Sequence, residues 1–209
     1  MYLIEVKRTH PALLELMSKH YSKPRGFVGR SIAFLIYERS IVVGAVVAGS
    51  ATLHLAGRDQ FFGVPKSKPE RKAILRNIVN NVFFRIEKDL FPHKPPRNYF
   101  RKALLLFEYT IEKRWTEKYG DPVLGIESLI ELPRTGVGYT RAGYTEVGQT
   151  VGYTCKRESH LTHVGKGNRD SWTGVRVWNT DPKSLRPKRV MCKRLRAEDT
   201  AAVGLSCAS

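Results

Sequence analysis

The chain has 209 residues, 42% of them hydrophobic, and its 36 Lys and Arg outnumber 19 Asp and Glu to give a formal net charge of +17. This composition suits one domain with a sizeable core, and no run approaches the roughly 20 apolar residues of a membrane span. The N-terminus, MYLIEVKRTHP, lacks signal-peptide design, and Cys155, Cys192 and Cys207 have neither disulfide-framework nor zinc-site spacing. We therefore expect a soluble protein of the reducing cytoplasm.

The surplus positive charge predicts a polyanionic partner. Between Arg134 and Arg194 there are 13 Lys and Arg against 4 Asp and Glu. Each phosphate that a Lys or Arg neutralises releases a condensed counterion, so such a surface binds nucleic acid. DNA, RNA and an anionic membrane could all use this charge, and a basic surface without a specific partner is the alternative.

Strand signals recur along the whole chain. They are alternating or β-branched apolar runs bounded by turn residues, and the second and third are close enough to form a hairpin. In chain order the predicted strands span residues 2–7, 31–37, 41–48, 80–88, 123–131, 146–156 and 188–195.

Helix signals alternate with these strands. A first helix is predicted from Pro11 to near Ser22, and a long one follows Asn98 and ends at about Tyr119. A further helix is expected before residue 80, and a short Gly-rich element at residues 135–144. One face of the long helix is apolar and comprises Phe100, Leu104, Phe107, Ile111 and Trp115.

This order predicts an α/β fold in which helices flank a mixed central sheet. We expect residues 1–196 to form a single catalytic domain. Within it, residues 158–187 read as a long basic loop, and residues 197–209 as a flexible tail.

His20, Tyr21 and Ser22 form the first candidate site, at the end of the first helix. A histidine beside a loop is well placed for proton transfer or metal binding. The alternative is that His20 only caps the last helix carbonyls and that Tyr21 completes the apolar stripe.

The second candidate site is the stretch ESLIELPRTGVGYTRAGY, which begins at Glu127. Carboxylates at the C-terminal end of a strand face the usual ligand crevice of an α/β sheet. Glu131 is followed by Arg134 and by glycines that let backbone approach a ligand. A plain turn with a surface ion pair explains the same residues.

The third candidate is a nucleic-acid surface in the C-terminal third. Basic residues interleave there with Tyr153, Trp172 and Trp178, which could stack on unpaired bases unless they pack into the core. The basic residues expected to contact phosphate are Lys156, Arg157, Lys166, Arg169, Arg176, Lys188 and Arg189.

Several short motifs follow one another along the chain and together indicate a family. They are HYS at residues 20–22, VVGAVVAGSA, VFFRIEKD, PPRNYFRKAL and TGVGYTRAGYTEVGQTVGYT, with KRVMCKRL near the end. Together they resemble the Mom proteins of bacteriophages, which are DNA-modifying enzymes with a GNAT-like acyltransferase fold. The resemblance covers roughly residues 10–157.

The resemblance implies an enzyme of a phage-infected bacterial cytoplasm that converts the N6 amine of adenine to a carbamoylmethyl derivative, so that DNA resists restriction. It implies DNA with a flipped adenine as substrate, an iron-dependent site and, in one proposal for the family, an acyl-CoA donor. His20 and Tyr21 match the family's His-Tyr pair, Tyr139 its G-x-x-Y tyrosine, and Glu131 its aspartate. His20 and Glu131 would hold the metal.

The chain also departs from the family pattern. Arg101 follows Asn98 where the pattern has a serine, and Arg134 replaces a histidine. These residues, with Ser22, are expected to bind substrate or donor. Residues 97–102 lack the glycines of a Q/R-x-x-G-x-G pyrophosphate loop, which disfavours acyl-CoA as the donor.

Two other functions remain open from the sequence. One is a non-catalytic DNA- or RNA-binding protein on the same scaffold. The other is a GNAT N-acetyltransferase that acts on a protein or a small amine. The sequence leaves the oligomeric state open, with a homodimer among the options.

Overall fold

The computed structural model describes residues 1–22, 27, 29–87, 89, 98–152, 154–157, 176–179 and 185–195. Of residues 154–157 and 176–179 it describes the backbone alone.

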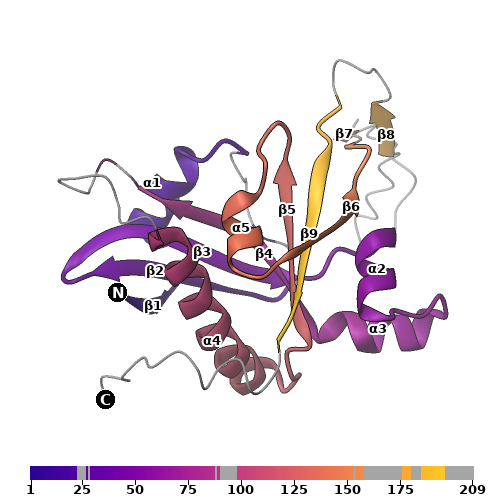
Figure 1. Ribbon diagram of the computed structural model, residues 1–209, viewed down its shortest axis with the longest axis horizontal. Helices are drawn as coiled ribbons and strands as arrows, with labels where there is room; N and C mark the ends of the chain where they lie inside the picture. Colours follow the sequence, from indigo (N-terminus) through magenta and orange to yellow (C-terminus); the bar gives the residue numbers. More distant parts are fainter. Residues whose placement is uncertain are drawn as a thin grey trace, which may run out of the picture.

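The chain folds around one seven-stranded sheet with the order β1-β2-β3-β4-β5-β9-β6, and a separate pair, β7-β8, lies apart from it (Figure 1). The strands of the large sheet are β1 (Tyr2–Val6), β2 (Ser31–Glu38), β3 (Ile41–Ser50), β4 (Ile78–Ile86), β5 (Gly125–Glu131), β6 (Thr145–Gln149) and β9 (Lys188–Arg194). The small sheet comprises β7 (Thr154–Arg157) and β8 (Arg176–Asn179).

Five helices accompany the sheet in the described part of the chain. They are α1 (Pro11–Ser18), α2 (Ala56–Phe62), α3 (Lys68–Arg76), α4 (Tyr99–Tyr119) and α5 (Val137–Arg141). None of these described helices combines the length and hydropathy that a bilayer span requires.

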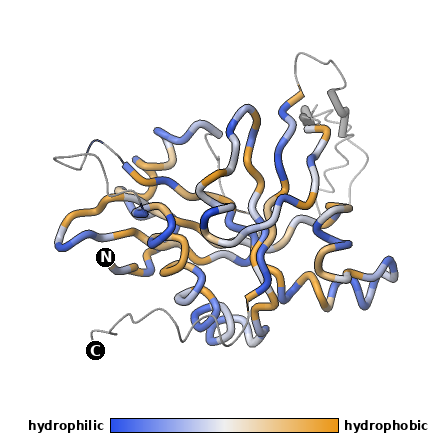
Figure 2. The backbone as a smooth tube through the Cα atoms, viewed as in Figure 1, coloured by the Kyte–Doolittle hydropathy of each residue, from blue (hydrophilic) through white to orange (hydrophobic). Residues whose placement is uncertain are grey.

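The helices cover both faces of the sheet. The apolar stripe of α4 packs with α5 residues against one face, where Leu104, Phe107, Ile111 and Trp115 are fully buried. Helix α1 packs on the opposite face through Leu13, and α2 and α3 extend that layer towards β9. Hydrophobic residues recur along the strands of the sheet and alternate with hydrophilic ones along the helices (Figure 2).

Among the described strands, only β4 and β5, at the centre of the sheet, pair in parallel. β4 and β5 pair only from Ile78 to Asn81 on one strand and from Gly125 to Ser128 on the other. Beyond Asn81 and Ser128 the strands continue to Ile86 and Glu131 without pairing to each other. β4 remains paired with β3, and β5 with β9, so the sheet opens a gap at its centre.

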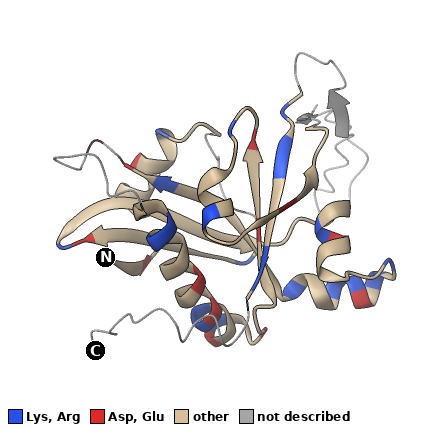
Figure 3. Ribbon diagram, viewed as in Figure 1, with Lys and Arg blue, Asp and Glu red and all other residues tan. Residues whose placement is uncertain are grey.

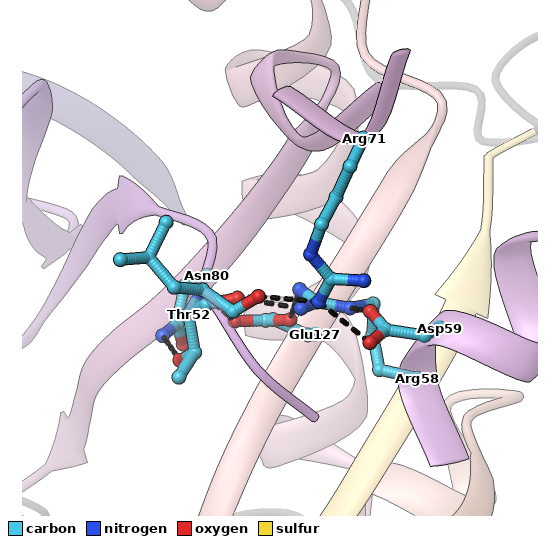
Figure 4. Close-up of polar contacts among 7 residues, drawn as sticks. Thr52, Arg58, Asp59, Arg71, Asn80 and Glu127 are labelled. Carbon is cyan, nitrogen blue, oxygen red and sulfur yellow. Dashed lines mark hydrogen bonds and ion pairs between the residues drawn. The ribbon is translucent and has the colours of Figure 1, made fainter. Parts of the chain in front are cut away.

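A buried ion pair stands beside the point where β4 and β5 separate. Arg58 of α2 and Glu127 of β5 are both 0% exposed and form a salt bridge. The Thr52 amide donates to Glu127 Oε1 at 2.7 Å, and Asn80 Nδ2 donates to Thr52 Oγ1 at 3.2 Å. Asp59 accepts from Arg58 and Arg71 on the outer side (Figure 4). The network fastens the β3–α2 connection to both central strands.

Most predicted elements are present, and the predicted fold class is confirmed. Three predicted details were wrong. The first helix ends at Ser18 and not near Ser22, and two helices, α2 and α3, lie between β3 and β4 where one was expected. Residues 146–156 do not form one strand but contribute to β6 and β7, which belong to different sheets. The predicted loop 158–187 contains β8 and residues 185–187; its other residues and the tail 197–209 lie outside the described residues.

Candidate functional site

The gap between β4 and β5 leads into a cavity of about 880 Å³. Its walls come from the turn after α1, from both separating strands, from the start of α4 and from the segment that leads into α5. The residues on which the site depends are His20, Tyr21, Ser22, Asn81, Phe84, Phe100, Ser128, Arg134, Tyr139, Arg141 and Lys188.

Aromatic side chains form one wall of the cavity. Phe84 and Phe100 meet edge to face with ring centroids 4.7 Å apart, and Phe100 meets Tyr139 in the same way at 5.5 Å. Gly138 allows this contact, because a Cβ there would lie 2.5 Å from the Phe100 ring. The wall is therefore apolar and suits a flat or acyl-bearing ligand.

His20 is buried at the cavity edge and is neutral. Its Nδ1 lies 2.8 Å from Ser22 Oγ and accepts the Ser22 amide at 3.3 Å, which places the ring proton on Nε2. The pKa of His20 is lowered to about 4, first by burial and then by the charges of Arg85 and Arg134, while a hydrogen bond with the Phe84 backbone acts in the opposite sense. At neutral pH the pair can accept a proton through the serine hydroxyl.

Tyr21 and Arg134 form a stack at the cavity mouth. The Arg134 guanidinium carbon lies 3.5 Å from the centre of the Tyr21 ring, and His20 lies on that ring at 4.2 Å. Tyr21 remains 40% exposed. A cation over an aromatic face is a stabilising contact, and it leaves the edge of the stack open to a ligand.

Tyr139 places its hydroxyl deep in the cavity. The residue is 9% exposed, and Asn81 Nδ2 donates to its hydroxyl oxygen at 3.3 Å. Burial raises the pKa of Tyr139 above its usual value, although a hydrogen bond from Ser128 acts in the opposite sense. The phenol therefore stays protonated at neutral pH and can donate a proton.

Among the described residues of the lining, the charged side chains are all basic: Arg134, Arg141 and Lys188. Arg101 supports this group, since its Nε donates to the Arg141 carbonyl at 3.1 Å. Lys and Arg also occur on α5 and at the start of β9 (Figure 3). A ligand bearing phosphate or another anion fits this lining.

The structure brings together His20, Tyr21, Ser22, Arg134, Tyr139 and Lys188, which the sequence had placed in separate candidate sites. Four other candidates are not among the described residues that line the cavity. Glu131 ends β5 opposite Lys188, Asn98 directly precedes α4, Arg101 contacts Arg141, and Arg189 pairs with Glu146 at 2.8 Å.

Most of the predicted nucleic-acid residues cannot be placed. Lys166 and Arg169 lie outside the described residues. Lys156, Arg157 and Arg176 belong to β7 and β8, of which only the backbone is described. Their role remains a prediction.

The residues present do not fit the expected iron site. No three His, Cys, Asp or Glu side chains come together as metal ligands within the described part of the chain. Nδ1 of His20 is already held by Ser22, and Glu131 does not line the cavity. We therefore assign no metal-dependent step to these residues.

Sequence reasoning missed Asn81, Ser128, Phe84 and Arg141, all of which line the cavity. The paired asparagines in IVNNVFFRI were the available signal, because two amides within a buried strand need partners. The strand pattern of residues 80–88 places both asparagines at the start of a predicted strand, without indicating a ligand site.

Comparisons with known proteins agree with this architecture. The profile of the family described as Druantia protein DruA matches residues 2–152, so the family found is not the Mom family that the motifs resemble. No curated protein sequence is significantly similar to the chain.

Solved structures show the fold. An acetyltransferase of Bacillus subtilis in complex with CoA superposes with a TM-score of 0.52 at 10% identity, over 93% of this chain and 99% of that one. The aminoglycoside 6'-N-acetyltransferase of Enterococcus faecium gives 0.47 at 13% identity, over 93% and 97% of the two chains. The fold is that of the GNAT acetyltransferases.

Proposed function

The chain belongs to the Druantia protein DruA family, and from this premise and its GNAT fold we propose that it transfers an acyl group to an amine. The reaction would take place in the cavity between β4 and β5. The observation that carries the proposal is that one cavity holds a neutral imidazole and a protonated phenol, those of His20 and Tyr139.

These two groups have the protonation states that acyl transfer to nitrogen requires. An attacking amine must lose a proton, and the leaving group must gain one. Nδ1 of His20 is an acceptor that Ser22 connects to the cavity at 2.8 Å. The Tyr139 hydroxyl is a donor that burial keeps protonated.

For the donor we propose a CoA thioester, which supplies an activated acyl group. The similar Bacillus subtilis protein is in complex with CoA. In this chain the unpaired edges of β4 after Asn81 and of β5 after Ser128 face the gap that the donor would occupy. Arg141 and Lys188 would attract its phosphates. This proposal replaces the expectation, drawn from residues 97–102, that disfavoured CoA.

The chain's residues then act in a fixed order. The acceptor nitrogen forms a bond to the acyl carbon and gives its proton to Ser22 Oγ, while the serine proton passes to His20 Nδ1. The carbon–sulfur bond breaks, and the Tyr139 hydroxyl supplies the proton that the sulfur takes up. Solvent restores the two side chains to their starting states.

Thiol release tests this proposal. Acetyl-CoA is incubated with the protein and with a polyamine, a lysine peptide or a single-stranded oligonucleotide in turn. We expect amine-dependent release of free thiol with at least one acceptor, and its loss in Tyr139→Phe. Absence of both saturable acetyl-CoA binding by calorimetry and thiol release with every acceptor would overturn it.

A second candidate function is modification of the N6 amine of adenine in DNA, with the duplex as partner. The net charge of +17 and the wholly basic charged lining favour this candidate. A target amine in the base stack would have to be flipped out to reach the cavity. A heavier deoxyadenosine in DNA from expressing cells, absent with Tyr139→Phe, would support it; unmodified nucleosides with folded protein present would contradict it.

A further inference from the structure

Arg134 carries a guanidinium at the cavity mouth that pairs with no acid in the described part of the chain. The residue is exposed, and its guanidinium carbon lies 3.5 Å from the centre of the Tyr21 ring. Glu131 is the nearest acidic residue along the chain, yet it forms no ion pair with Arg134, and neither does any other described carboxylate. The N–H donors of this guanidinium are therefore available to a ligand.

The stack of Arg134 on Tyr21 joins the two sides of the gap in the sheet. Tyr21 follows α1, and its neighbour His20 packs on Phe83 of β4 with ring centroids 4.8 Å apart. Arg134 follows β5, and Tyr21 reaches that strand through a hydrogen bond with the Glu131 backbone. The guanidinium thus rests on a ring that is held from both sides, so a ligand has less side-chain freedom to remove when it binds.

The charge of Arg134 acts at the place where the proposed base stands. Arg134 and Arg85 are both close enough for their charges to act on His20, whose Nδ1 lies 2.8 Å from Ser22 Oγ. Arg85 is paired with Glu87 at 3.1 Å, so Arg134 is the cation of the two that has no acidic partner among the described residues.

This charge distribution disfavours a polycation as the acyl acceptor. The lining has no Asp or Glu among its described residues. A polyamine would bring its remaining ammonium groups close to Arg134 without a carboxylate to hold them, and like charges repel at short distance. An acceptor with an anionic group has the opposite sign.

The shape of the guanidinium indicates which anions it would bind. Its N–H groups form a planar fork that donates two parallel hydrogen bonds to a carboxylate or a phosphate. Ser22 and Arg134 line the same cavity. An acceptor could therefore present its amine to Ser22 and an oxyanion to Arg134.

We propose that Arg134, held over the Tyr21 ring, binds an oxyanion of the acceptor, so that the acceptor is an amine that also carries a phosphate or a carboxylate group. The inference rests on the proposed function in that the ligand of Arg134 is the acyl acceptor. Arg141 and Lys188, which are assigned to the donor, have no part in it. Binding of the oxyanion requires no acyl transfer, so it can be tested separately.

The test compares the affinities of small primary amines by NMR titration of the protein. Ethanolamine, O-phosphoethanolamine, β-alanine and 1,3-diaminopropane present a primary amine together with a hydroxyl, a phosphate, a carboxylate and a second ammonium group, respectively. CoA is present throughout, because it has no acyl group to transfer and occupies the residues assigned to the donor.

We expect phosphoethanolamine or β-alanine to bind at least about tenfold more tightly than ethanolamine, as hydrogen bonds to a charged group allow. The diamine should bind most weakly. The tighter of the two anionic amines identifies phosphate or carboxylate as the group that Arg134 binds. Equal affinities of the anionic and neutral amines, or no binding by any of them, would overturn the inference.

Arg134→Gln supplies the second arm, since it removes the charge and the fork from an exposed position. It should reduce the affinity of the anionic amines to that of ethanolamine, which should change little. Arg114→Gln is the matched control, because Arg114 is an exposed arginine that pairs with Glu5 at 2.8 Å, and it should keep the preference. With thermal unfolding confirming the fold, a preference that persists in Arg134→Gln, or that both variants lose, would overturn the inference.

The two proposals fail in different ways. Preferential binding of an anionic amine without thiol release from any acceptor would remove the acyl-transfer proposal and leave the oxyanion site at Arg134 intact. Thiol release with a polyamine, combined with equal affinities of the anionic and neutral amines, would remove the inference about Arg134 alone.

Discussion

The side-chain amide of Asn81 donates to the hydroxyl of Tyr139 at 3.3 Å and so connects the central strand β4 with helix α5. This contact lies where β4 and β5 stop pairing. It fixes a phenol that burial keeps protonated at the inner end of the cavity. The separation of β4 from β5 therefore positions the proposed proton donor through one hydrogen bond.

Replacing Tyr139 with Phe removes the proposed proton donor and keeps the ring that packs against Phe100. We expect kcat for acyl transfer to fall by about 10²- to 10⁴-fold, as is usual for the loss of a general acid. Denaturant unfolding should show a loss of about 1–3 kcal/mol in the free energy of unfolding, because the buried Asn81 amide loses its acceptor, and the variant should still fold. A folded variant with unchanged kcat would rule out this role for Tyr139.

The pKa of His20 should respond to its basic neighbours. This pKa is lowered to about 4, mainly by burial and in part by the charges of Arg85 and Arg134. Arg134→Ala should therefore raise the value measured by NMR titration of the imidazole, and Arg114→Ala serves as the control because Arg114 pairs with Glu5 and does not act on His20. An unchanged His20 pKa in Arg134→Ala would contradict this arrangement.

His20 should also make stability depend on pH. Its pKa is about 4 when folded, below the value of 6.5 for an unperturbed histidine, so the unfolded chain binds the proton first. The contribution of His20 to the free energy of unfolding is complete above pH 6.5, and it is lost as the pH falls towards 4. The free energy of unfolding of His20→Gln, measured in urea across this range, should decline less steeply. Parallel curves for the two proteins would refute the assignment.

Removing only one member of the buried pair of Arg58 and Glu127 should strongly destabilise the fold. Arg58→Met leaves a carboxylate at 0% exposure without its partner, and we expect a loss of about 3–5 kcal/mol in the free energy of unfolding. Adding Glu127→Leu should recover most of this loss. Arg114→Ala, which breaks an exposed pair with Glu5, should cost under about 1 kcal/mol. Equal losses for the single and double variants would contradict the account.

The sequence predicted the fold well because periodic apolar residues determine which faces are buried. The stripe from Leu104 to Trp115 is an example, since all its members lie in the core. Arg58 shows the limit of the method. It is fully buried in α2, yet a charged residue in a short segment reads as solvent-exposed, and its partner Glu127 lies 69 positions away.

The site could be predicted only in parts. His20 and Tyr139 stood out through their residue types and motifs, and the fold placed both on one cavity. Glu131 ends β5 beside residues that line the cavity but is not itself among the described lining residues, so its role stays a prediction. Asn81 was missed although the paired asparagines offered a signal, since the sequence does not reveal that β4 separates from β5 at this residue.

Acetylation of an amine in the presence of the purified protein tests the central claim most directly. A mixture of polyamine, lysine peptide and single-stranded oligonucleotide is incubated with acetyl-CoA and analysed by mass spectrometry, the oligonucleotide after digestion to nucleosides. We predict one class of amine heavier by an acetyl group with the unaltered protein and unmodified with Tyr139→Phe. Unmodified amines of every class, with the protein folded and acetyl-CoA intact, would contradict the claim.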